Sequence, residues 1–581
     1  MKTKILRTLT ISLFALTMAS VSTTFAGKRG GNHDDNRLEL TLIHMGDVHG
    51  HLIPRPHLRS DGNGELQGGL ARLYTKIEKI RENSDRSLLI NTGDTIQGSA
   101  EALYTRGQAL VDVINKFEVD YFAPGNWEFV YGTERFQELF AGPEPVAPWG
   151  ALAANLYFDG YPYADKTGLR VLPPYTIKEI DGVKIGILGF TTERGPKVIG
   201  AEVVQGFRFS KGDAEMAEFV PLLKSKVDVL LVISELGLAN NIRLAEANPG
   251  IDIILSSDMH EETFEPVYTS TGTLIIEEGQ DGTRLGELKL SINDGVLKST
   301  EFTMHVIDSR IKEDRGISRK VASVRKPFVT GSFKPQLNPI NGTTLTTPID
   351  TVIGQADIGL HRSNFAHEEM PAVIEGSSHN FLADVFKEMT QADAGILRGF
   401  RYGTHIAPGP IKLEDIYHYV AIGPFIAKGN VTGQQIKNVI ENTSDGSLNA
   451  DPAKWRGGWL FAWSGLTFDL DPYAAHGSRA SNIMIHDVET DVWAPLDLTA
   501  SYSLGGYNFD SEANLINKIP AQNVVQYTHP DGNAVDGTQV VMDYLKTRTA
   551  NPDLNRINIL APLPAPKFGN LEIQPLQGAT P

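Results

Sequence analysis

The feature that most constrains the fold is an alternation of short apolar runs with amphipathic segments across residues 38–310. Five runs rich in Ile, Leu and Val have the length and continuity of strands that are buried on both faces: LELTLIH, SLLINT, VKIGILGF, DVLLVIS and IDIILSS. Between the first two, GGLARLYTKIEKI carries apolar residues at helical spacing, so one face of this segment should pack on a sheet. The alternation predicts a layered α/β domain over residues 38–310.

A chain of 581 residues needs more than one such unit, because a single core rarely grows beyond about 250–300 residues. Residues 311–348 contain KPFVTGSFKPQLNPINGTTLTTP, which is rich in Pro and Thr with little periodicity, and we predict a connector there. A second domain of the α+β class is predicted over residues 349–564, with a helix in SSHNFLADVFKEMT. Residues 565–581 are expected to form a loose tail.

The N-terminus has the three parts of a secretory signal. Three basic residues lie within the first seven positions, TLTISLFALTMAS forms a short apolar segment, and small residues precede a suitable cleavage site after Ala26. We therefore predict a signal peptide over residues 1–26 and a flexible polar leader over residues 27–37, with an uncleaved membrane anchor as the alternative. The mature protein is expected in the periplasm or outside the cell, without stable insertion in the membrane.

Composition excludes several classes of function. The chain has no cysteine, which rules out disulfides, thiolate metal sites and cysteine nucleophiles. The formal net charge is −17, so nucleic acid polymers and anionic lipids are not expected as partners. A small phosphorylated substrate can still bind where a metal ion or an arginine supplies positive charge.

Polar side chains follow the predicted strands of the first domain. Loops at the carboxyl ends of strands in an open α/β sheet meet in one crevice. Seven donors are expected there: Asp47, His49, Asp94, Asn126, Glu235, Asp258 and His260. Each alone could have an ordinary role such as capping a helix, but several carboxylates in one crevice repel one another unless a cation neutralises them. Oxygen and imidazole ligands without sulfur suit Mn, Mg, Fe or Zn.

The blocks that carry these residues resemble a known family. IHMGDVHGHL, NTGDTIQGSA, PGNWEF, and ISELGL with PGIDIILSSDMHEE are similar, in order and spacing, to the calcineurin-like metallophosphatase domain and more narrowly to the secreted 5′-nucleotidases. A second match, clearest in GSSHNFLADVFKEMTQADAGILRG, runs from about 350 to 560. The resemblance implies a four-layer α/β/β/α sandwich followed by a 5′-nucleotidase-type substrate domain.

The resemblance also implies a cofactor of two divalent cations about 3.5–4 Å apart, which activate a water molecule for attack on phosphorus. It places Asp47, His49 and His260 on the first ion and Asn126 on the second, with Asp94 as the bridge. Asp94 and Asn126 are therefore expected to be catalytic as well as ligating. Manganese is the expected ion, with magnesium, zinc, iron or calcium as alternatives.

The sequence departs from the family pattern at the second ion. Glu235 and Asp258 stand where the family has His, so the ligands there would all be oxygen atoms, which favours harder ions over zinc. The added negative charge would repel an anionic substrate unless both ions were bound. Alternatively, the second site is empty.

Trp127 is the third departure. The family has a His here that stabilises the transition state, held by an Asp where this chain has Val130. Indole offers one N–H donor and no titratable proton, and the loss of one positioned donor costs about 10²–10³ in rate. Trp127 either belongs to a changed catalytic device or only packs the loop. The SoxB-type thiosulfohydrolases share the two-domain plan and carry Trp at this position.

The second domain supplies further candidate contacts with substrate. RGFRYGT resembles the arginine-bearing loop of the thiosulfohydrolases, so Arg398 and Arg401 are expected to bind an anion, with Arg401 also counted as catalytic. The nucleotidases hold the base between two Phe rings. Near EDIYHYVAIGP, where the first is expected, this chain has Val420 and Ile422 instead. Phe509 with Asn508 matches the second, although Phe509 could equally be a core aromatic.

These features favour an exported, metal-dependent hydrolase of phosphomonoesters such as nucleotides. One alternative is a SoxB-like thiosulfohydrolase that releases sulfate from a cysteine S-thiosulfonate on a sulfur-carrier protein. A second alternative is a binding scaffold without turnover. The retained Asp47, His49, Asp94, Asn126 and His260 argue against the scaffold, and the missing His weakens the case for a nucleotidase.

Overall fold

The computed structural model describes residues 37–57, 64–260, 262–361, 374–397, 405–448 and 460–561. The predicted signal peptide and tail lie outside the described residues, as do Arg398 and Arg401. None of the helices in the described ranges has the length and apolar character needed to cross a membrane.

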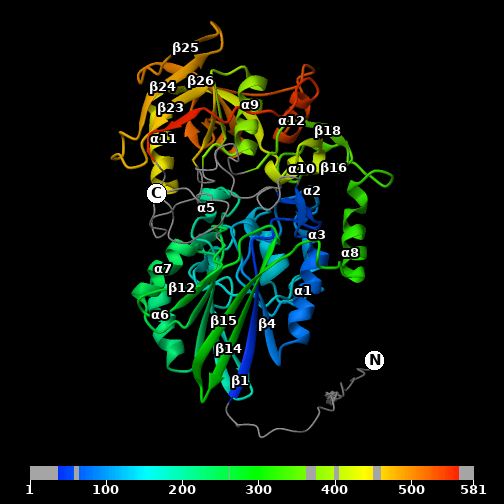
Figure 1. Cartoon of the computed structure of the whole chain (residues 1–581), viewed down its shortest axis with the longest axis vertical. Coiled ribbons are helices and arrows are strands. Elements are labelled where there is room, and N and C mark those ends of the chain that lie inside the picture. The colour runs from blue at the N-terminus through cyan, green and yellow to red at the C-terminus, as the bar shows by residue number, and fades with distance from the viewer. Residues whose placement is uncertain are drawn as a thin grey trace, which may run out of the picture.

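The first domain contains two sheets, and helices lie to either side of the pair (Figure 1). The first sheet has the strand order β15 (Val296–Val306), β14 (Arg284–Asn293), β1 (Arg37–Met45), β4 (Arg86–Asn91) and β5 (Tyr121–Phe122). The second has the order β12 (Val267–Tyr268), β13 (Leu274–Glu277), β11 (Ile253–Ser256), β10 (Val229–Ser234), β8 (Val183–Phe190) and β7 (Tyr175–Ile180). Strands β8, β10, β11 and β13 are parallel, so their carboxyl ends lie at one edge.

Successive side chains of each strand point to opposite faces, which sorts the core into layers. In β1, Leu40 and Leu42 pack between the two sheets, whereas Ile43 packs with the outer helices. The helices beside the first sheet include α1 (Leu70–Glu82), α3 (Gln108–Ile114) and α8 (Arg315–Arg325), and those beside the second include α6 (Asp213–Lys224) and α7 (Leu238–Ala247). This is the predicted four-layer α/β/β/α sandwich.

The second domain has the predicted mixed α and β content. One sheet has the order β22 (Ala462–Ser464), β19 (Ala394–Leu397), β26 (Ser501–Asn508), β21 (Phe425–Thr432) and β29 (Gln522–Gln526). Another has the order β25 (Val492–Pro495), β24 (Ala480–Asp487), β23 (Leu466–Leu470) and β30 (Ile557–Ile559). Its helices in the described ranges are α9 (Ser377–Thr390), α10 (Leu413–Tyr419), α11 (Gly433–Ser447) and α12 (Gly537–Leu545).

Shorter elements complete the described part of the chain. The helices are α2 (Ala100–Tyr104), α4 (Thr133–Phe136) and α5 (Gly195–Val198). The paired strands are β2 (Arg55–His57) with β3 (Glu65–Gln67), β6 (Leu156–Phe158) with β9 (Phe207–Phe209), β16 (Gln336–Leu337) with β17 (Thr344–Leu345), β18 (Val352–Ala356) with β20 (Gly409–Lys412), and β27 (Leu515–Ile516) with β28 (Ile519–Pro520).

The predicted secondary structure is confirmed where apolar residues are dense. The five apolar runs form β1, β4, β8, β10 and β11, and the two predicted helices are α1 and α9. The predicted connector contains helix α8, which the sequence does not reveal. Ile317, Val321 and Val324 of α8 recur at helical spacing, but three apolar residues in a polar segment are too few to mark the helix plainly in the sequence.

Ion pairs join the second domain to the first. Arg55 Nη1 lies 2.6 Å from Asp415 Oδ1 at the start of α10. Arg325 of α8 pairs with both Glu101 and Glu414. Carboxylates in the first turn of α10 are also favoured by the partial positive charge at a helix N-terminus. These contacts hold α10 against the first domain and the connector.

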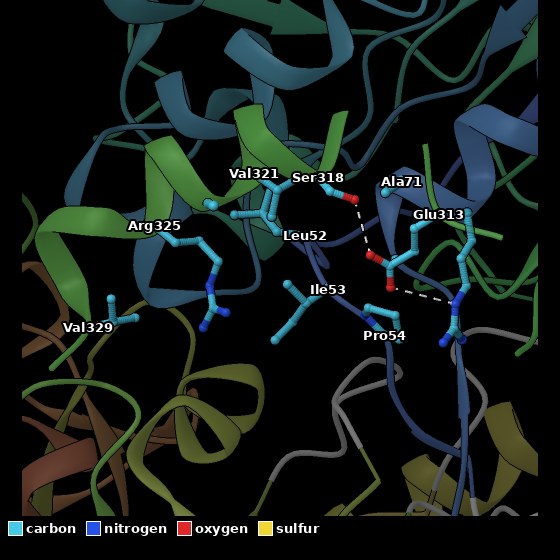
Figure 2. Close-up of a pocket in the computed structure, with 12 residues that line it drawn as sticks. Leu52, Ile53, Pro54, Ala71, Glu313, Ser318, Val321, Arg325 and Val329 are labelled. Carbon is cyan, nitrogen blue, oxygen red and sulfur yellow. Dashed lines mark hydrogen bonds and ion pairs between the residues drawn. The ribbon is translucent and has the colours of Figure 1, made fainter. Parts of the chain in front are cut away.

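A cavity of about 290 Å³ lies beneath α8 (Figure 2). Figure 2 shows Leu52, Ile53 and Pro54 on one side and Val321 and Arg325 of α8 on the other. None of its lining residues is a predicted metal ligand. It is therefore separate from the candidate metal centre.

Candidate metal centre

The seven predicted donors lie just beyond the carboxyl ends of strands. Asp47 and His49 follow β1, Asp94 follows β4, Asn126 follows β5, Glu235 follows β10, and Asp258 and His260 follow β11. All seven are buried. The seven residues thus lie on loops at the carboxyl ends of strands, as the sequence predicts.

Two groups of ligand atoms come close together. The ligand atoms of Asp47, His49 and His260 lie within 4.8 Å of one another, and so do those of Asp47, Asp94 and Glu235. His260 Nε2 lies 3.5 Å from Asp47 Oδ1, and His49 Nε2 lies 3.5 Å from Asp94 Oδ2. Asp47 is the member shared by the two groups, whereas the bridging role of Asp94 stays a prediction. The arrangement offers two adjacent positions for cations.

Glu235 shows why a cation fits this crevice. Its side chain is fully buried, and neither carboxylate oxygen has a hydrogen-bond partner among the described residues. Burial, followed by the charges of Asp94, Asp47 and Asp258, raises the pKa of Glu235 well above its usual value. Burial likewise raises the pKa of Asp47, with His49 opposing and Asp94 adding to the effect. A divalent cation would satisfy these oxygens and remove the repulsion.

His49 is held in place by a carboxylate that sequence reasoning missed. Asp281 Oδ1 lies 3.5 Å from His49 Nδ1, the ring nitrogen opposite the cluster. Burial, the largest influence, lowers the pKa of His49, but hydrogen bonds with Asp281 and Asp94 and the charges of Asp47 and Asp94 together raise the pKa to about 10. A carboxylate behind a ligating His orients the ring and increases its basicity. The signal in the sequence is slight, a GQDG turn after β13.

The carboxamide of Asn126 lies between two kinds of neighbour. One end faces only acceptor atoms, and the other faces Trp127 Nε1 and Trp127 N, at 3.1 and 3.2 Å. An amide nitrogen directed at the acceptors satisfies them without a cation. An amide oxygen in that direction would require a cation between them. The orientation that satisfies both ends of the amide without a cation turns its oxygen to Trp127, and the role of Asn126 as a ligand to a second ion stays a prediction.

The ligand loops approach one another too closely for ordinary side chains. A Cβ on Gly125 would overlap Asp94 Oδ1 and lie 2.5 Å from Glu235 Oε1. Five of the predicted ligands also have positive φ: Asp47 (45°), His49 (44°), Asp94 (46°), Asp258 (90°) and His260 (63°). Such conformations cost about 1–3 kcal/mol each and persist where surrounding structure fixes them, commonly at functional sites.

Glu128 joins two of these loops, and sequence reasoning did not single it out. Its Oε2 accepts hydrogen bonds from Asp94 N at 2.9 Å and Gly125 N at 2.7 Å, and its Oε1 accepts one from Thr95 N at 2.7 Å. Burial, with the charge of Asp94, raises the pKa of Glu128 to about 7. Glu128 is thus a positioning residue for the loops that carry Asp94 and Asn126.

Glu128→Gln is expected to loosen this junction. The new NH₂ group would face backbone donors, and an unsatisfied buried donor costs about 1–3 kcal/mol, measurable as the free energy of unfolding in urea. Loss of a supporting partner should also lower Mn affinity about 10–100-fold. Glu134→Gln, at an exposed side chain that forms no ion pair with the described residues, is the matched control and should change neither quantity. An unchanged Mn affinity in Glu128→Gln would contradict the positioning role.

Asp258 has a partner that the sequence does not indicate. Its Oδ2 forms an ion pair with Arg194 Nη2, and its backbone N donates to Asp47 Oδ2 at 3.1 Å. Asp258 belongs to neither group of convergent ligand atoms found among the described residues. Its assignment as a ligand stays a prediction.

Trp127 packs at the boundary between the domains. Its side chain is 6% exposed and clusters with Val130 and with Ala421 of the second domain, against which Ile199 and Ile422 also pack. Ala421 and Ile422 belong to the segment where the nucleotidases carry the first of their base-holding Phe rings. Trp127 and this altered segment therefore touch each other.

The predicted substrate contacts of the second domain have structural partners where they are described. Asn508 donates from Nδ2 to Leu515 O at 3.0 Å and accepts from Gln526 Nε2 at 2.9 Å, so its amide holds its own turn together. Phe509 is partly buried against the core that contains Tyr507. Arg398 and Arg401 lie outside the described residues.

Comparison with known families divides the chain as the structure does. Residues 40–262 match the model of the calcineurin-like phosphoesterases. Residues 352–514 match the model of the 5′-nucleotidase C-terminal domain. The two models together cover more than half of the chain.

Curated relatives extend across both domains. The chain is 25% identical over 540 residues to the protein named "Probable 5′-nucleotidase" of Treponema pallidum, covering 80% of this chain and 85% of that one. It is 23% identical over 554 residues to the NAD 5′-nucleotidase of Haemophilus influenzae, covering 85% and 87%.

Solved structures with the same fold include two from Thermus thermophilus. A sulfate thiohydrolase SoxB superposes with a TM-score of 0.74 at 19% identity, covering 91% of this chain and 98% of that one. A 5′-nucleotidase precursor superposes with a TM-score of 0.72 at 21% identity, covering 90% and 99%. At these identities the likeness establishes the two-domain fold.

Proposed function

The chain belongs to the 5′-nucleotidase family of calcineurin-like metallophosphatases, and from this premise we propose that it is an exported hydrolase that releases phosphate from 5′-nucleotides or related phosphomonoesters with manganese as cofactor. Family membership makes it a metal-dependent phosphoric ester hydrolase. The observation that carries the proposal is the buried carboxylate of Glu235, which has no hydrogen-bond partner among the described residues and lies in one cluster with Asp47 and Asp94. The N-terminal signal pattern supports export.

The residues of the crevice have different roles in the proposed reaction. When bound, divalent cations supply a water molecule acidic enough to be a nucleophile at neutral pH, together with positive charge for the phosphoryl oxygens. Asp47, His49 and His260 would hold one ion, and Asp94, Glu235 and Asn126 would complete the other position. Asp281 orients the His49 ring through Nδ1, the ring nitrogen that faces away from the cluster. Trp127 has no titratable proton, so the leaving oxygen must take its proton from another group.

The test is phosphate release by purified protein loaded with Mn, measured on a panel of 5′-nucleotides and simple phosphomonoesters. We expect release by the loaded protein, none after chelation, and recovery when Mn is restored. A preference for nucleotides over simple phosphomonoesters would support the substrate class. Absence of release from every member, with Mn bound, would overturn the proposal.

Trp127 favours one alternative, hydrolysis of sulfonated sulfur on a carrier protein. A Trp at this position occurs in the SoxB-type enzymes, and here it packs on the altered segment at Ala421 and Ile422. Sulfate release from a carrier that bears cysteine S-thiosulfonate tests this alternative. Sulfate release without phosphate release would replace the first proposal with the second. Weak Mn binding with neither release would favour a scaffold that only binds.

A further inference from the structure

Arg194 lies beside the metal centre, where it pairs with Asp258. It follows β8 and immediately precedes α5, in the segment TTERGPK. This segment is tied to the loop that carries Asn126, because Thr191 Oγ1 donates to Pro124 O at 2.6 Å. Val198 and Ile199, at the end of the same turn, pack against Trp127. Arg194 is therefore fixed between the ligand loops and the second domain.

The guanidinium of Arg194 is anchored at one end. Its Nη2 pairs with Asp258 Oδ2, and the same nitrogen lies 3.9 Å from Met259 Sδ. Its Nε and Nη1 form no hydrogen bond with the described residues. The Arg194 side chain is 21% exposed, against 2% for Asp258, so part of the side chain reaches solvent next to a buried predicted ligand. A guanidinium has five N–H donors in a planar fork that fits phosphate oxygens.

The carboxylates of the crevice favour a positively charged side chain at the position of Arg194. Asp47, Asp94, Glu235 and Asp258 contribute four carboxylates, whose charge would offset that of two bound divalent cations and leave little net attraction for a phosphate dianion. Among the described residues, Arg194 is the one Arg or Lys that forms an ion pair with a predicted ligand. The ion pair with Arg194 offsets the charge of Asp258.

We propose that Arg194 is a substrate-binding residue that, anchored on Asp258, presents its remaining N–H groups to the phosphoryl oxygens. The inference rests on the proposed function, since it names the residue that binds the phosphoryl group at the same site. It also gives Asp258 a positioning role in place of metal ligation. Asp258, which stands where the family has His, and Arg194 then act together to bind the phosphoryl group.

The experiment measures binding of inorganic phosphate to Mn-loaded protein by calorimetry, together with the Mn content of each variant. Arg194→Gln is expected to weaken phosphate binding and raise KM by on the order of 10–100-fold, the effect of one charged hydrogen bond, with Mn content unchanged and kcat changed much less. Arg194→Lys keeps the charge but loses the fork, so its effect should be intermediate. Arg243→Gln, at an exposed arginine paired with Asp213, is the matched control and should behave as wild type.

Two outcomes would overturn the proposal, and a third would separate it from the proposed function. Phosphate binding as tight in Arg194→Gln as in wild type would show that Arg194 does not bind the phosphoryl group. Loss of Mn from Arg194→Gln, with its melting temperature retained, would show that Arg194 acts on the cations instead. Phosphate binding is measured without turnover. If wild type binds phosphate through Arg194 yet hydrolyses no phosphoester, the proposed function fails and the anion site stands.

Discussion

Asp94→Ala is expected to abolish Mn binding and phosphate release together. Asp94 belongs to the cluster with Asp47 and Glu235, and its Oδ2 lies 3.5 Å from His49 Nε2. Loss of a supporting partner alone costs about 10–100-fold in metal affinity, so loss of a ligand should exceed about 100-fold. Mn binding by calorimetry and phosphate release from a 5′-nucleotide measure the two effects.

The metal-free form of Asp94→Ala should stay folded. The charge of Asp94 raises the pKa of Glu235, so removing it relieves repulsion among buried carboxylates. Asp94 Oδ1 also accepts a hydrogen bond from Trp127 N at 2.8 Å, and the loss of this bond offsets the relieved repulsion. We therefore expect a melting temperature in chelator close to that of wild type. Asp181→Ala is the matched control, because Asp181 lies outside the crevice in a pair with Arg86 that is half exposed. Full turnover by Asp94→Ala would show that the cluster is not the reaction centre.

Trp127→Ala is expected to lower the free energy of unfolding by about 3–5 kcal/mol, the usual cost of truncating a buried aromatic side chain. The Trp127 ring is 6% exposed and fills the space between Val130 and Ala421. Urea denaturation in the presence of chelator measures this effect without a contribution from metal. Trp127→Phe retains an aromatic ring and should lose much less.

Trp493→Ala is the control for Trp127→Ala, because the same substitution falls on a side chain that is 46% exposed. Its effect should stay within about 0.5 kcal/mol. If Trp127→Ala unfolds at the same urea concentration as wild type, the packing role is wrong. Trp127 would then have to be explained by contact with substrate.

Much of the fold can be predicted from the sequence, because strands that are buried on both faces appear as continuous apolar runs. Strand β10 is VLLVIS, and all of its residues are buried. Helix α9 coincides with the predicted segment. Helix α8 was not predicted because it buries only Ile317 and Val321 and begins at a capping Asp314, whose side chain accepts from Ile317 N. Capping of this kind is local, whereas apolar periodicity needs several turns.

A residue of the candidate site can be predicted from sequence only when its type and its place at the end of a strand are enough to identify it as a ligand. Asp47 and His260 follow from that rule. Glu128 does not, because its role depends on backbone N–H groups of Asp94 and Gly125 that folding brings to it. Arg194 does not either, because its partner is 64 residues away in the chain. Sequence order carries no sign of such contacts.

In the second domain, a residue that matches a motif can have partners that the motif does not indicate. Asn508 matches a motif, yet its amide is used by Leu515 and Gln526. A motif gives the residue type, whereas the partners of a polar side chain depend on the turn around it. Arg398 and Arg401 stay predictions, because they lie outside the described residues.

Anomalous diffraction at the manganese edge, from crystals of Mn-loaded protein, is the measurement that tests the metal centre most directly. We expect two peaks about 3.5–4 Å apart, one beside His49 and His260 and the other beside Glu235, with Asp94 as the predicted bridge between them. Arg194 should remain on Asp258, which should contact neither peak. Absence of anomalous signal from this crevice, in crystals whose Mn content is confirmed, would contradict the account.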